Sequence, residues 1–254
     1  VMAVPRVLDY YACRMNSDPF TAALHADDAL AEFPDVAPPL RPTTTYERVA
    51  GGRIYRRDGD ETVARLEAVV GALEGGHSVA YPSGMAAVAA VLRHVQPQRI
   101  SLPVDVYHGV RQFVGSEIER GSWLLVDPDE LQRGDVWWVE TPSNPKCFVT
   151  DLASVAEVAA RRGVTTVVDA TFATPILQRT LSYGVDFSVH ATTKFIAGHS
   201  DAMGGVVSTL DEAVAGELLS ARTIDGAVPG TLETWLTLRG IRTLPLRVLR
   251  QSET

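Results

Sequence analysis

The 254-residue sequence predicts an α/β fold, in which helices cover both faces of a mostly parallel sheet to form an α/β/α sandwich. Two observations lead to this prediction. Short apolar runs of strand length alternate along the chain with segments of roughly 10 to 14 residues that have helical periodicity. Small and polar residues also follow directly after several of these strands, as is typical of an open α/β sheet with a ligand site along one edge.

Prolines interrupt residues 1–45, so we expect this segment to form an irregular N-terminal arm rather than part of the sheet. Its last part, Pro38 to Thr45, contains three prolines and then three threonines, and it is predicted to be extended. Such a segment has little of its own chain to pack against. We therefore expect the arm to lie on another subunit.

The first long helix should begin at Glu61 or Thr62, because apolar residues recur at helical spacing from Val63 to Leu73 before Gly75 ends the pattern. A strand at 78–81 follows, and then an Ala- and Val-rich helix to residue 94. Further strands are expected at 99–103, 123–126, 136–140, 165–168, 185–189 and 204–208, and further helices at 107–119, 152–162 and 231–251.

The turn at Ser83 and Gly84 joins a strand to a helix and could bind an anion. Both are residue types that begin helices well, and the free N–H groups and dipole of a helix N-terminus attract phosphate. Turns of this kind also serve simple packing, so the turn alone leaves both interpretations open.

Lys194 is one of only two lysines among 23 Lys and Arg residues. Lysine, unlike arginine, can lose its proton and form an imine, so Lys194 is a candidate Schiff-base residue. Taken by itself, a lone lysine is more often an ordinary surface amine. Gly84, Asn144, Asp169 and Lys194 each follow a predicted strand and should meet at one sheet edge. An amine, a carboxylate and a phosphate-type turn are what pyridoxal phosphate needs.

Composition excludes several other classes of function. The net charge of −8, with both signs interspersed, argues against nucleic acid and anionic membranes as partners. No apolar run reaches the ~18 residues of a membrane span, so we expect a cytoplasmic protein. The two cysteines, Cys13 and Cys147, lack metal-ligand spacing, and we expect no metal site and no disulfide framework.

Five motifs occur in order: IYRRDGDETVARLE (54–67), YPSGMAA (81–87), ETPSNP (140–145), a long stretch from DATFATP to AGHSD (169–201), and GAVPGTLETWLTLRGIRTLPLRVLRQ (226–251). Together they resemble the Cys/Met-metabolism pyridoxal-phosphate enzymes, which include cystathionine γ-synthase and cystathionine γ-lyase. The resemblance covers roughly residues 36 to 254. It implies a fold-type I pyridoxal-phosphate transferase fold.

The resemblance also implies roles for individual residues. Lys194 looks like the lysine that forms the imine with the cofactor and then moves protons, Asp169 like the partner of the pyridine nitrogen, and Tyr107 like the ring-stacking tyrosine that also acts as a catalytic acid. The family pattern places further residues at the cofactor, with the first two contributed to the phosphate of a neighbouring subunit: Tyr55, Arg57, Ser83, Gly84, Met85, Asn144, Thr171 and Thr193.

The sequence also departs from the family pattern. Ala191 stands where a phosphate-binding serine is usual, which removes one hydrogen bond, and Gly109 stands where methionine γ-lyases have a cysteine. Residues 46–230 are expected to form the cofactor-binding domain. Residues 231–254 would begin a long helix leading to a C-terminal domain that this chain does not contain, and that domain carries the arginine for the substrate carboxylate in the family.

The resemblance implies chemistry at C–S bonds of an amino acid, namely cystathionine or an O-activated homoserine. The first expectation is cystathionine γ-lyase-type elimination to cysteine, 2-oxobutanoate and ammonia. Alternatives are γ-replacement of the cystathionine γ-synthase or O-acetylhomoserine sulfhydrylase type, and a cofactor-binding but catalytically silent homologue. A lysine aldolase without cofactor is hard to reconcile with Asp169. Sharing of Tyr55 and Arg57 implies a homodimer or homotetramer with shared active sites.

Overall fold

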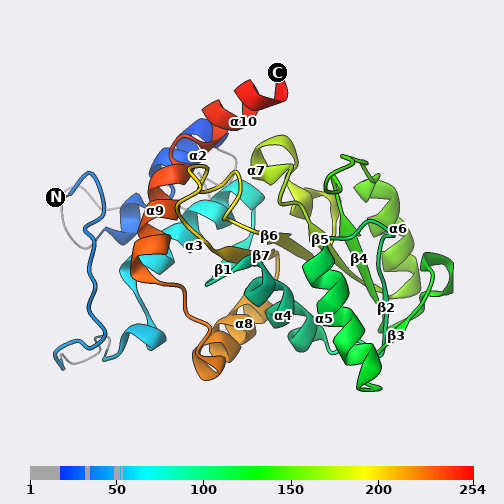
Figure 1. Cartoon of the computed structure of the whole chain (residues 1–254). Helices are drawn as coiled ribbons and strands as arrows, with labels where there is room; N and C mark the ends of the chain where they lie inside the picture. Colours follow the sequence, from blue (N-terminus) through cyan, green and yellow to red (C-terminus); the bar gives the residue numbers. More distant parts are fainter. Residues whose placement is uncertain (1–17, 32–34, 49–51, 53) are drawn as a thin grey trace, which may run out of the picture.

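A computed structural model describes residues 18–31, 35–48, 52 and 54–254 (Figure 1). Its centre is a seven-stranded sheet with the strand order β1-β7-β6-β5-β4-β2-β3. The strands are β1 (His77–Tyr81), β2 (Arg99–Ser101), β3 (Leu124–Leu125), β4 (Val136–Glu140), β5 (Thr165–Asp169), β6 (Phe187–His190) and β7 (Gly205–Thr209). Each predicted strand is therefore present, with ends that differ by a few residues.

The sheet is mostly parallel, as the sequence predicted. The neighbouring strands β3, β2, β4, β5 and β6 run in one direction, whereas β7 is antiparallel to both β6 and β1. The chain can return directly from β6 to β7 through a loop because antiparallel neighbours need no crossover helix. That loop carries Lys194.

Helices cover both faces of the sheet, which gives the expected three layers (Figure 1). On one face lie α4 (Gly84–Val95), α5 (His108–Glu119) and α8 (Glu212–Asp225), whose apolar side chains share a core with Trp138 and Val167. The next residues along those strands, Val139 and Val168, point to the opposite face. That face is covered by α3 (Glu61–Glu74), α6 (Leu152–Arg162), α7 (Thr174–Leu177) and α9 (Thr231–Ile241).

The expectation of one continuous helix from 231 to 251 was wrong. Helix α9 ends at Ile241 and α10 (Leu244–Ser252) begins after Arg242 and Thr243. Pro245 lies in the first turn of α10, where a proline fits well, but its missing N–H and its ring would not fit the interior of a continuous helix.

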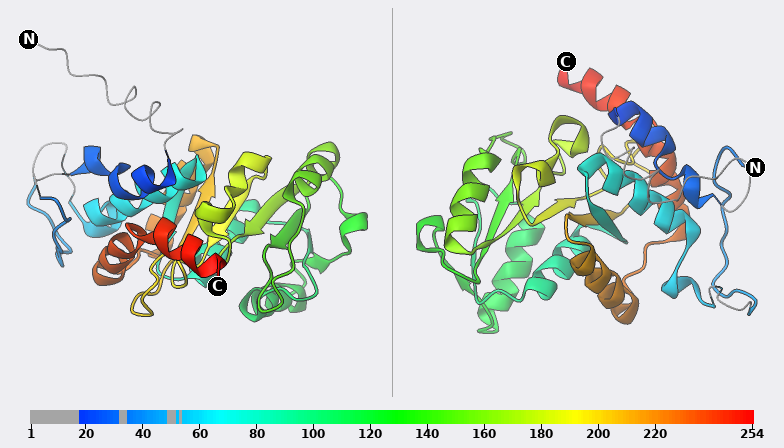
Figure 2. Two further views of the ribbon diagram at one scale, coloured as in Figure 1. Left: turned by 90° about the horizontal axis from the view of Figure 1, so that it is seen from above. Right: turned by 180° about the vertical axis from the view of Figure 1, so that it is seen from behind.

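The arm is also more regular than predicted, because α2 (Pro19–His25) lies within it. Asp18 caps this helix by accepting a hydrogen bond from the Thr21 amide, and Pro19 occupies its first turn. Residues 1–17 and 32–34 of the predicted arm lie outside the described residues. The views from above and behind show α2 beside α10 (Figure 2), in agreement with the contacts between these two helices.

A buried carboxylate ties this part of the arm to the domain. Asp27 accepts hydrogen bonds from Arg65 of α3 at 2.6 Å and from both terminal nitrogens of Arg242 at 2.7 Å. Burial alone would raise the pKa of Asp27, but the hydrogen bonds and charges of the two arginines outweigh it and lower the pKa. The arm segment is therefore anchored by an ionised group that is well paired.

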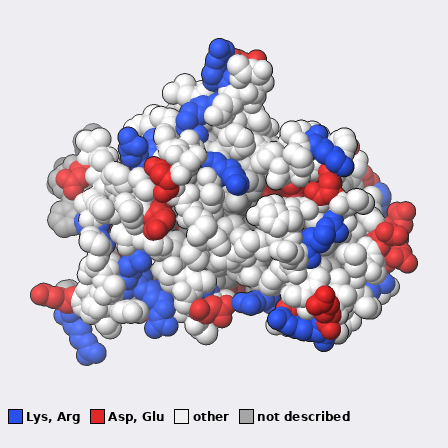
Figure 3. Space-filling view, in the orientation of Figure 1, with Lys and Arg blue, Asp and Glu red and all other residues white. Residues whose placement is uncertain are grey.

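The part of the chain that the structure describes holds neither a helix that could span a membrane nor a cluster of metal-ligating side chains. None of its helices has the length and apolarity needed to cross a membrane. Within the same residues, His, Cys, Asp and Glu side chains form no group that could hold a metal ion. On the face shown in Figure 3, acidic and basic side chains are interspersed rather than gathered by sign.

Candidate active site

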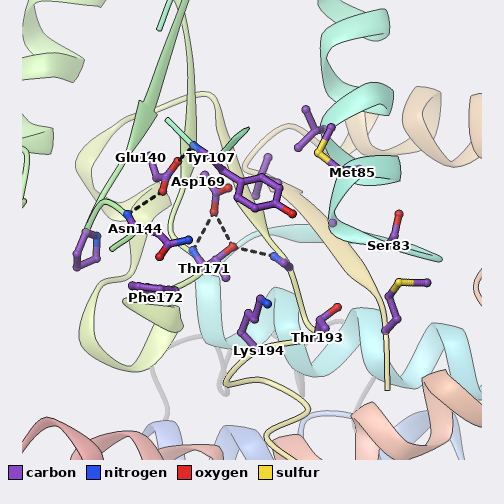
Figure 4. A pocket seen from close by; sticks show the side chains of 16 residues that line it. Ser83, Met85, Tyr107, Glu140, Asn144, Asp169, Thr171, Phe172, Thr193 and Lys194 are labelled. Atoms are coloured by element: carbon purple, nitrogen blue, oxygen red, sulfur yellow. Dashed lines mark hydrogen bonds between the residues drawn. The ribbon is translucent and has the colours of Figure 1, made fainter. Parts of the chain in front are cut away.

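A cavity of about 240 Å³ lies at the edge of the sheet where β1, β4, β5 and β6 end. Figure 4 shows its lining side chains, which come from segments far apart in the sequence. Gly84, Asn144, Asp169 and Lys194 all line it, so the convergence predicted from their positions after strands is present. Ser83, Met85, Tyr107, Thr171 and Thr193 line the same cavity.

The N-terminus of α4 points its first turn at this cavity. Ser83 caps the helix, and its hydroxyl accepts a hydrogen bond from the Ala86 amide at 3.0 Å. The amides of Gly84 and Met85 have no acceptor within the described residues. The structure therefore offers two free N–H groups at a helix N-terminus, which is a favourable place for a phosphate.

Gly84 is required by a close approach of the β6 end. A Cβ at Gly84 would lie only 2.8 Å from Cβ of Ala191, inside any normal carbon–carbon contact. Ala191 itself is fixed because its amide donates to Oγ1 of Thr171 at 2.8 Å. The small side chains at both positions allow the α4 turn and the Lys194 loop to lie against each other.

Asp169 is the last residue of β5, and its carboxylate is held by Thr171. The amide and the hydroxyl of Thr171 both donate to Oδ1 of Asp169, at 3.0 and 2.6 Å. Burial raises the pKa of Asp169, while these hydrogen bonds and the positive potential of His190 act in the opposite direction. A cationic partner inside the cavity would favour the ionised carboxylate.

Lys194 lies in the loop between β6 and β7, and its side chain points into the cavity (Figure 4). Its Nζ has no hydrogen-bond or ion-pair partner among the residues that the structure describes. The loop around it is well held. The hydroxyl of Thr193 donates to the carbonyl of Gly204 and accepts from its amide, and Arg247 of α10 donates to the carbonyls of Phe195 and Ile196. The loop is thus fixed while the amine is free to react.

Tyr107 and Asn144 enter the cavity from two loops on the other side. Tyr107 is the N-cap residue of α5, and its ring lies beside Gly109, where a Cβ would come within 2.7 Å of the ring. Asn144 lies in the turn after β4. Both backbone amides donate to one carboxylate, that of Glu140, at 2.7 Å from Tyr107 and 3.0 Å from Asn144.

Tyr55 and Arg57 are the predicted site residues that do not line the cavity. Tyr55 forms an isolated β-bridge with Thr45, and the guanidinium of Arg57 lies 5.5 Å from the centre of the Tyr55 ring. Arg57 also donates to the carbonyl of Thr223 in α8 at 3.2 Å. Their role at a neighbouring subunit's phosphate remains a prediction.

Glu140, Phe172 and Met203 are among the lining residues that were not predicted as site residues. Each lies within a motif quoted above or within two residues of one, but only Glu140 carried a usable signal, as a carboxylate at the end of a strand. Phe172 and Met203 have the ordinary appearance of core residues in the sequence.

The groups around the cavity fit pyridoxal phosphate. They comprise an unpaired amine for its aldehyde, a carboxylate for its ring nitrogen and free amides at a helix N-terminus for its phosphate.

Comparison with models of known protein families tests the family resemblance directly. The family model for the Cys/Met metabolism PLP-dependent enzymes matches residues 20–254. The chain belongs to this family. The family resemblance, the fold and the cofactor class predicted from the sequence are thereby confirmed.

Members of the family with similar sequences differ in activity. A cystathionine γ-synthase of Mycobacterium bovis is 36% identical in an alignment of 260 positions that covers 93% of this chain and 66% of that protein. A cystathionine β-lyase of Bacillus subtilis is 36% identical over 235 residues, covering 86% of this chain and 60% of the relative. The crystal structure of a cystathionine γ-lyase from Micromonospora echinospora superimposes with a TM-score of 0.83 at 34% identity, over 91% of this chain and 65% of that one. The chain thus spans about two thirds of the length of its relatives.

Proposed function

We propose that this chain is the cofactor-binding part of an enzyme that acts on C–S bonds of amino acids of the cystathionine type. The observation that carries the proposal is the arrangement of the Lys194 amine, the Asp169 carboxylate and the free amides of α4 around one cavity. The names of the similar proteins support trans-sulfuration chemistry at this site.

Each of these groups has a separate task in holding the cofactor. Lys194 would bind it covalently through Nζ, and Asp169 would keep the ring nitrogen protonated. The amides of Gly84 and Met85 would bind the phosphate, with the hydroxyl of Thr193 beside them. A ring-nitrogen proton close to Asp169 would offset the effect of burial on its carboxyl, because an opposite charge nearby favours the ionised form.

The bound cofactor would supply an electron sink for the pair of electrons left at the substrate's Cα. Lys194, displaced by the substrate amine, takes the proton from Cα, since its amine has no competing partner in the cavity. The same amine can return a proton further along the substrate. Tyr107, which lines the cavity and is partly exposed, would protonate the leaving sulfur.

We propose in addition that the working unit is at least a dimer. Tyr55 and Arg57 do not line the cavity of their own chain, and among the described residues the Arg57 guanidinium contacts the Thr223 carbonyl and the Tyr55 ring. A symmetric neighbour could present both residues to a phosphate. A homotetramer would satisfy the same requirement.

Among the possible reactions, α,γ-elimination of cystathionine to cysteine, 2-oxobutanoate and ammonia is the first to test. Products identify the reaction: β-elimination would yield homocysteine and pyruvate, and γ-replacement would consume cysteine and an O-activated homoserine.

The experiment uses the protein reconstituted with pyridoxal phosphate and supplied with L-cystathionine. We expect a visible absorption band of bound cofactor and release of a ketoacid. Lys194→Ala should lose both, whereas Lys146→Ala, which removes the other lysine, should retain both. A visible band without turnover of any of these substrates would support a silent homologue instead.

A further inference from the structure

Glu140 connects two predicted cofactor-contacting residues through their backbones. It is the last residue of β4 and is buried, with only 7% of its surface exposed. Oε2 accepts from the amide of Tyr107 at 2.7 Å, and Oε1 accepts from the amide of Asn144 at 3.0 Å. Figure 4 shows this carboxylate between the two residues. Each of its oxygens therefore holds a different loop.

The contact is chemically demanding. Only a carboxylate offers two acceptor oxygens in this geometry, because an amide side chain replaces one acceptor with a donor. The site is unfavourable for a negative charge, since burial and the nearby carboxylates of Asp169 and Asp105 raise the pKa of Glu140. A carboxylate at such a place indicates that the two hydrogen bonds matter.

A second carboxylate connects the same two loops in a simpler way. Asp105 lies two residues before Tyr107 and accepts one hydrogen bond from the hydroxyl of Ser143, at 2.7 Å. Ser143 lies directly before Asn144. Asp105 thus links the loops without contacting the amide of either site residue, and it needs only one acceptor oxygen.

We propose that Glu140 is a positioning residue, which sets the placement of Tyr107 relative to Asn144 and so determines how tightly and in what orientation the cofactor is held. The inference rests on the proposed function for the identity of the ligand. Glu140 itself neither donates nor accepts the reacting protons.

The test compares two acid-to-amide substitutions on the same pair of loops. Glu140→Gln must leave one of the two amides facing an NH₂ group, whereas Asp105→Asn keeps a carbonyl oxygen for its single hydroxyl donor. Apparent Kd for pyridoxal phosphate is measured by titrating cofactor-free protein, and the orientation of the ring by visible circular dichroism. We expect Kd to rise about tenfold or more and the dichroism band to change in Glu140→Gln, because hydrogen bonds to charged groups are worth about 1.5–3 kcal/mol.

Asp105→Asn should stay within about twofold of the unsubstituted protein with the same band, since its bond is retained. A third variant, Glu140→Asp, keeps the charge but shortens the reach. It should resemble Glu140→Gln if placement rather than charge is responsible. Amide hydrogen exchange on cofactor-free protein supplies a readout independent of any variant's yield: the Tyr107 and Asn144 amides should be protected in the unsubstituted protein.

Equal changes in Kd and dichroism for Glu140→Gln and Asp105→Asn, or none in Glu140→Gln, would overturn the proposal. So would rapid exchange of both amides in the unsubstituted protein. These outcomes do not depend on turnover. If the protein binds cofactor tightly but converts none of the amino acids offered, the proposed function fails while the role of Glu140 is still decided.

Discussion

Replacing Gly84 with alanine perturbs the phosphate turn by a single methyl group. The new Cβ would lie 2.8 Å from Cβ of Ala191 and 3.3 Å from its Cα. Carbon atoms in contact are normally about 3.5 Å apart or more, so the two segments must separate by roughly 0.7 Å. Ala191 cannot retreat freely, because its amide is bonded to Thr171. We therefore expect the first turn of α4 to move and cofactor-free Gly84→Ala to lose about 1–3 kcal/mol of stability.

A matched glycine substitution separates this effect from the general effect of alanine in helices. Gly115 lies within α5 and has open space where a Cβ would be added. Gly115→Ala should raise stability by about 0.5–1 kcal/mol, because alanine favours the helix relative to glycine.

Two measurements on cofactor-free protein decide the matter: urea unfolding monitored by circular dichroism, and titration with pyridoxal phosphate. Gly84→Ala should be less stable and have a higher apparent Kd, while Gly115→Ala should be more stable with Kd unchanged. If Gly84→Ala unfolds at the same urea concentration as the unsubstituted protein and binds cofactor equally well, the reasoning about the close approach is wrong.

Three further predictions follow from other contacts. Because burial raises the pKa of Asp169, the native state keeps this proton to higher pH than the unfolded chain, so the stability of the cofactor-free protein should fall as the pH rises above the ordinary pKa of 3.8. Asp169→Asn should reduce that fall, measured as melting temperature at different pH, and should also weaken cofactor binding. An unchanged pH dependence in Asp169→Asn would contradict this prediction. Asp27→Ala should cost about 3–5 kcal/mol in urea unfolding, since it leaves Arg65 and Arg242 without their buried partner; a loss below about 1 kcal/mol would show that the arm is held otherwise. Arg57→Ala should raise the apparent Kd for pyridoxal phosphate without lowering the melting temperature of the cofactor-free protein, and an unaltered Kd would remove Arg57 from the phosphate site.

The fold could be predicted wherever local signals agreed with the tertiary structure. The strand at 136–140 and the helix at 152–162 have the predicted bounds, and Asp151 caps that helix while Gly163 ends it in the left-handed region at φ 68°. Helix α8 was not predicted although it carries the same signals, an Asp211 cap and Gly226 at φ 73°. These two signals were sufficient to predict α8 from the sequence.

Other elements depended on contacts that no local pattern contains. Helix α2 has only seven residues, too few to be stable alone, and it forms because Ala22 and its C-cap residue Ala26 pack against the domain. The meeting of the site residues at one edge of the sheet could be predicted, because ligand sites in open α/β sheets lie at the carboxyl ends of the strands. The role of Glu140 could not, because its partner Tyr107 lies 33 residues away and the contact is made through the backbone.

The antiparallel strand β7 has a consequence for synthesis of the chain on the ribosome. Strand β1 has one neighbour in the sheet, β7, so Val79 must wait for Val207 before it can pair. The α4 turn follows β1 directly, and its partner surface at Gly205 belongs to β7. A nascent chain can therefore assemble β2 to β6 early, whereas the phosphate turn becomes ordered only when the last strand has emerged. Cofactor capture should be a late event, because such long-range pairing is slow to form.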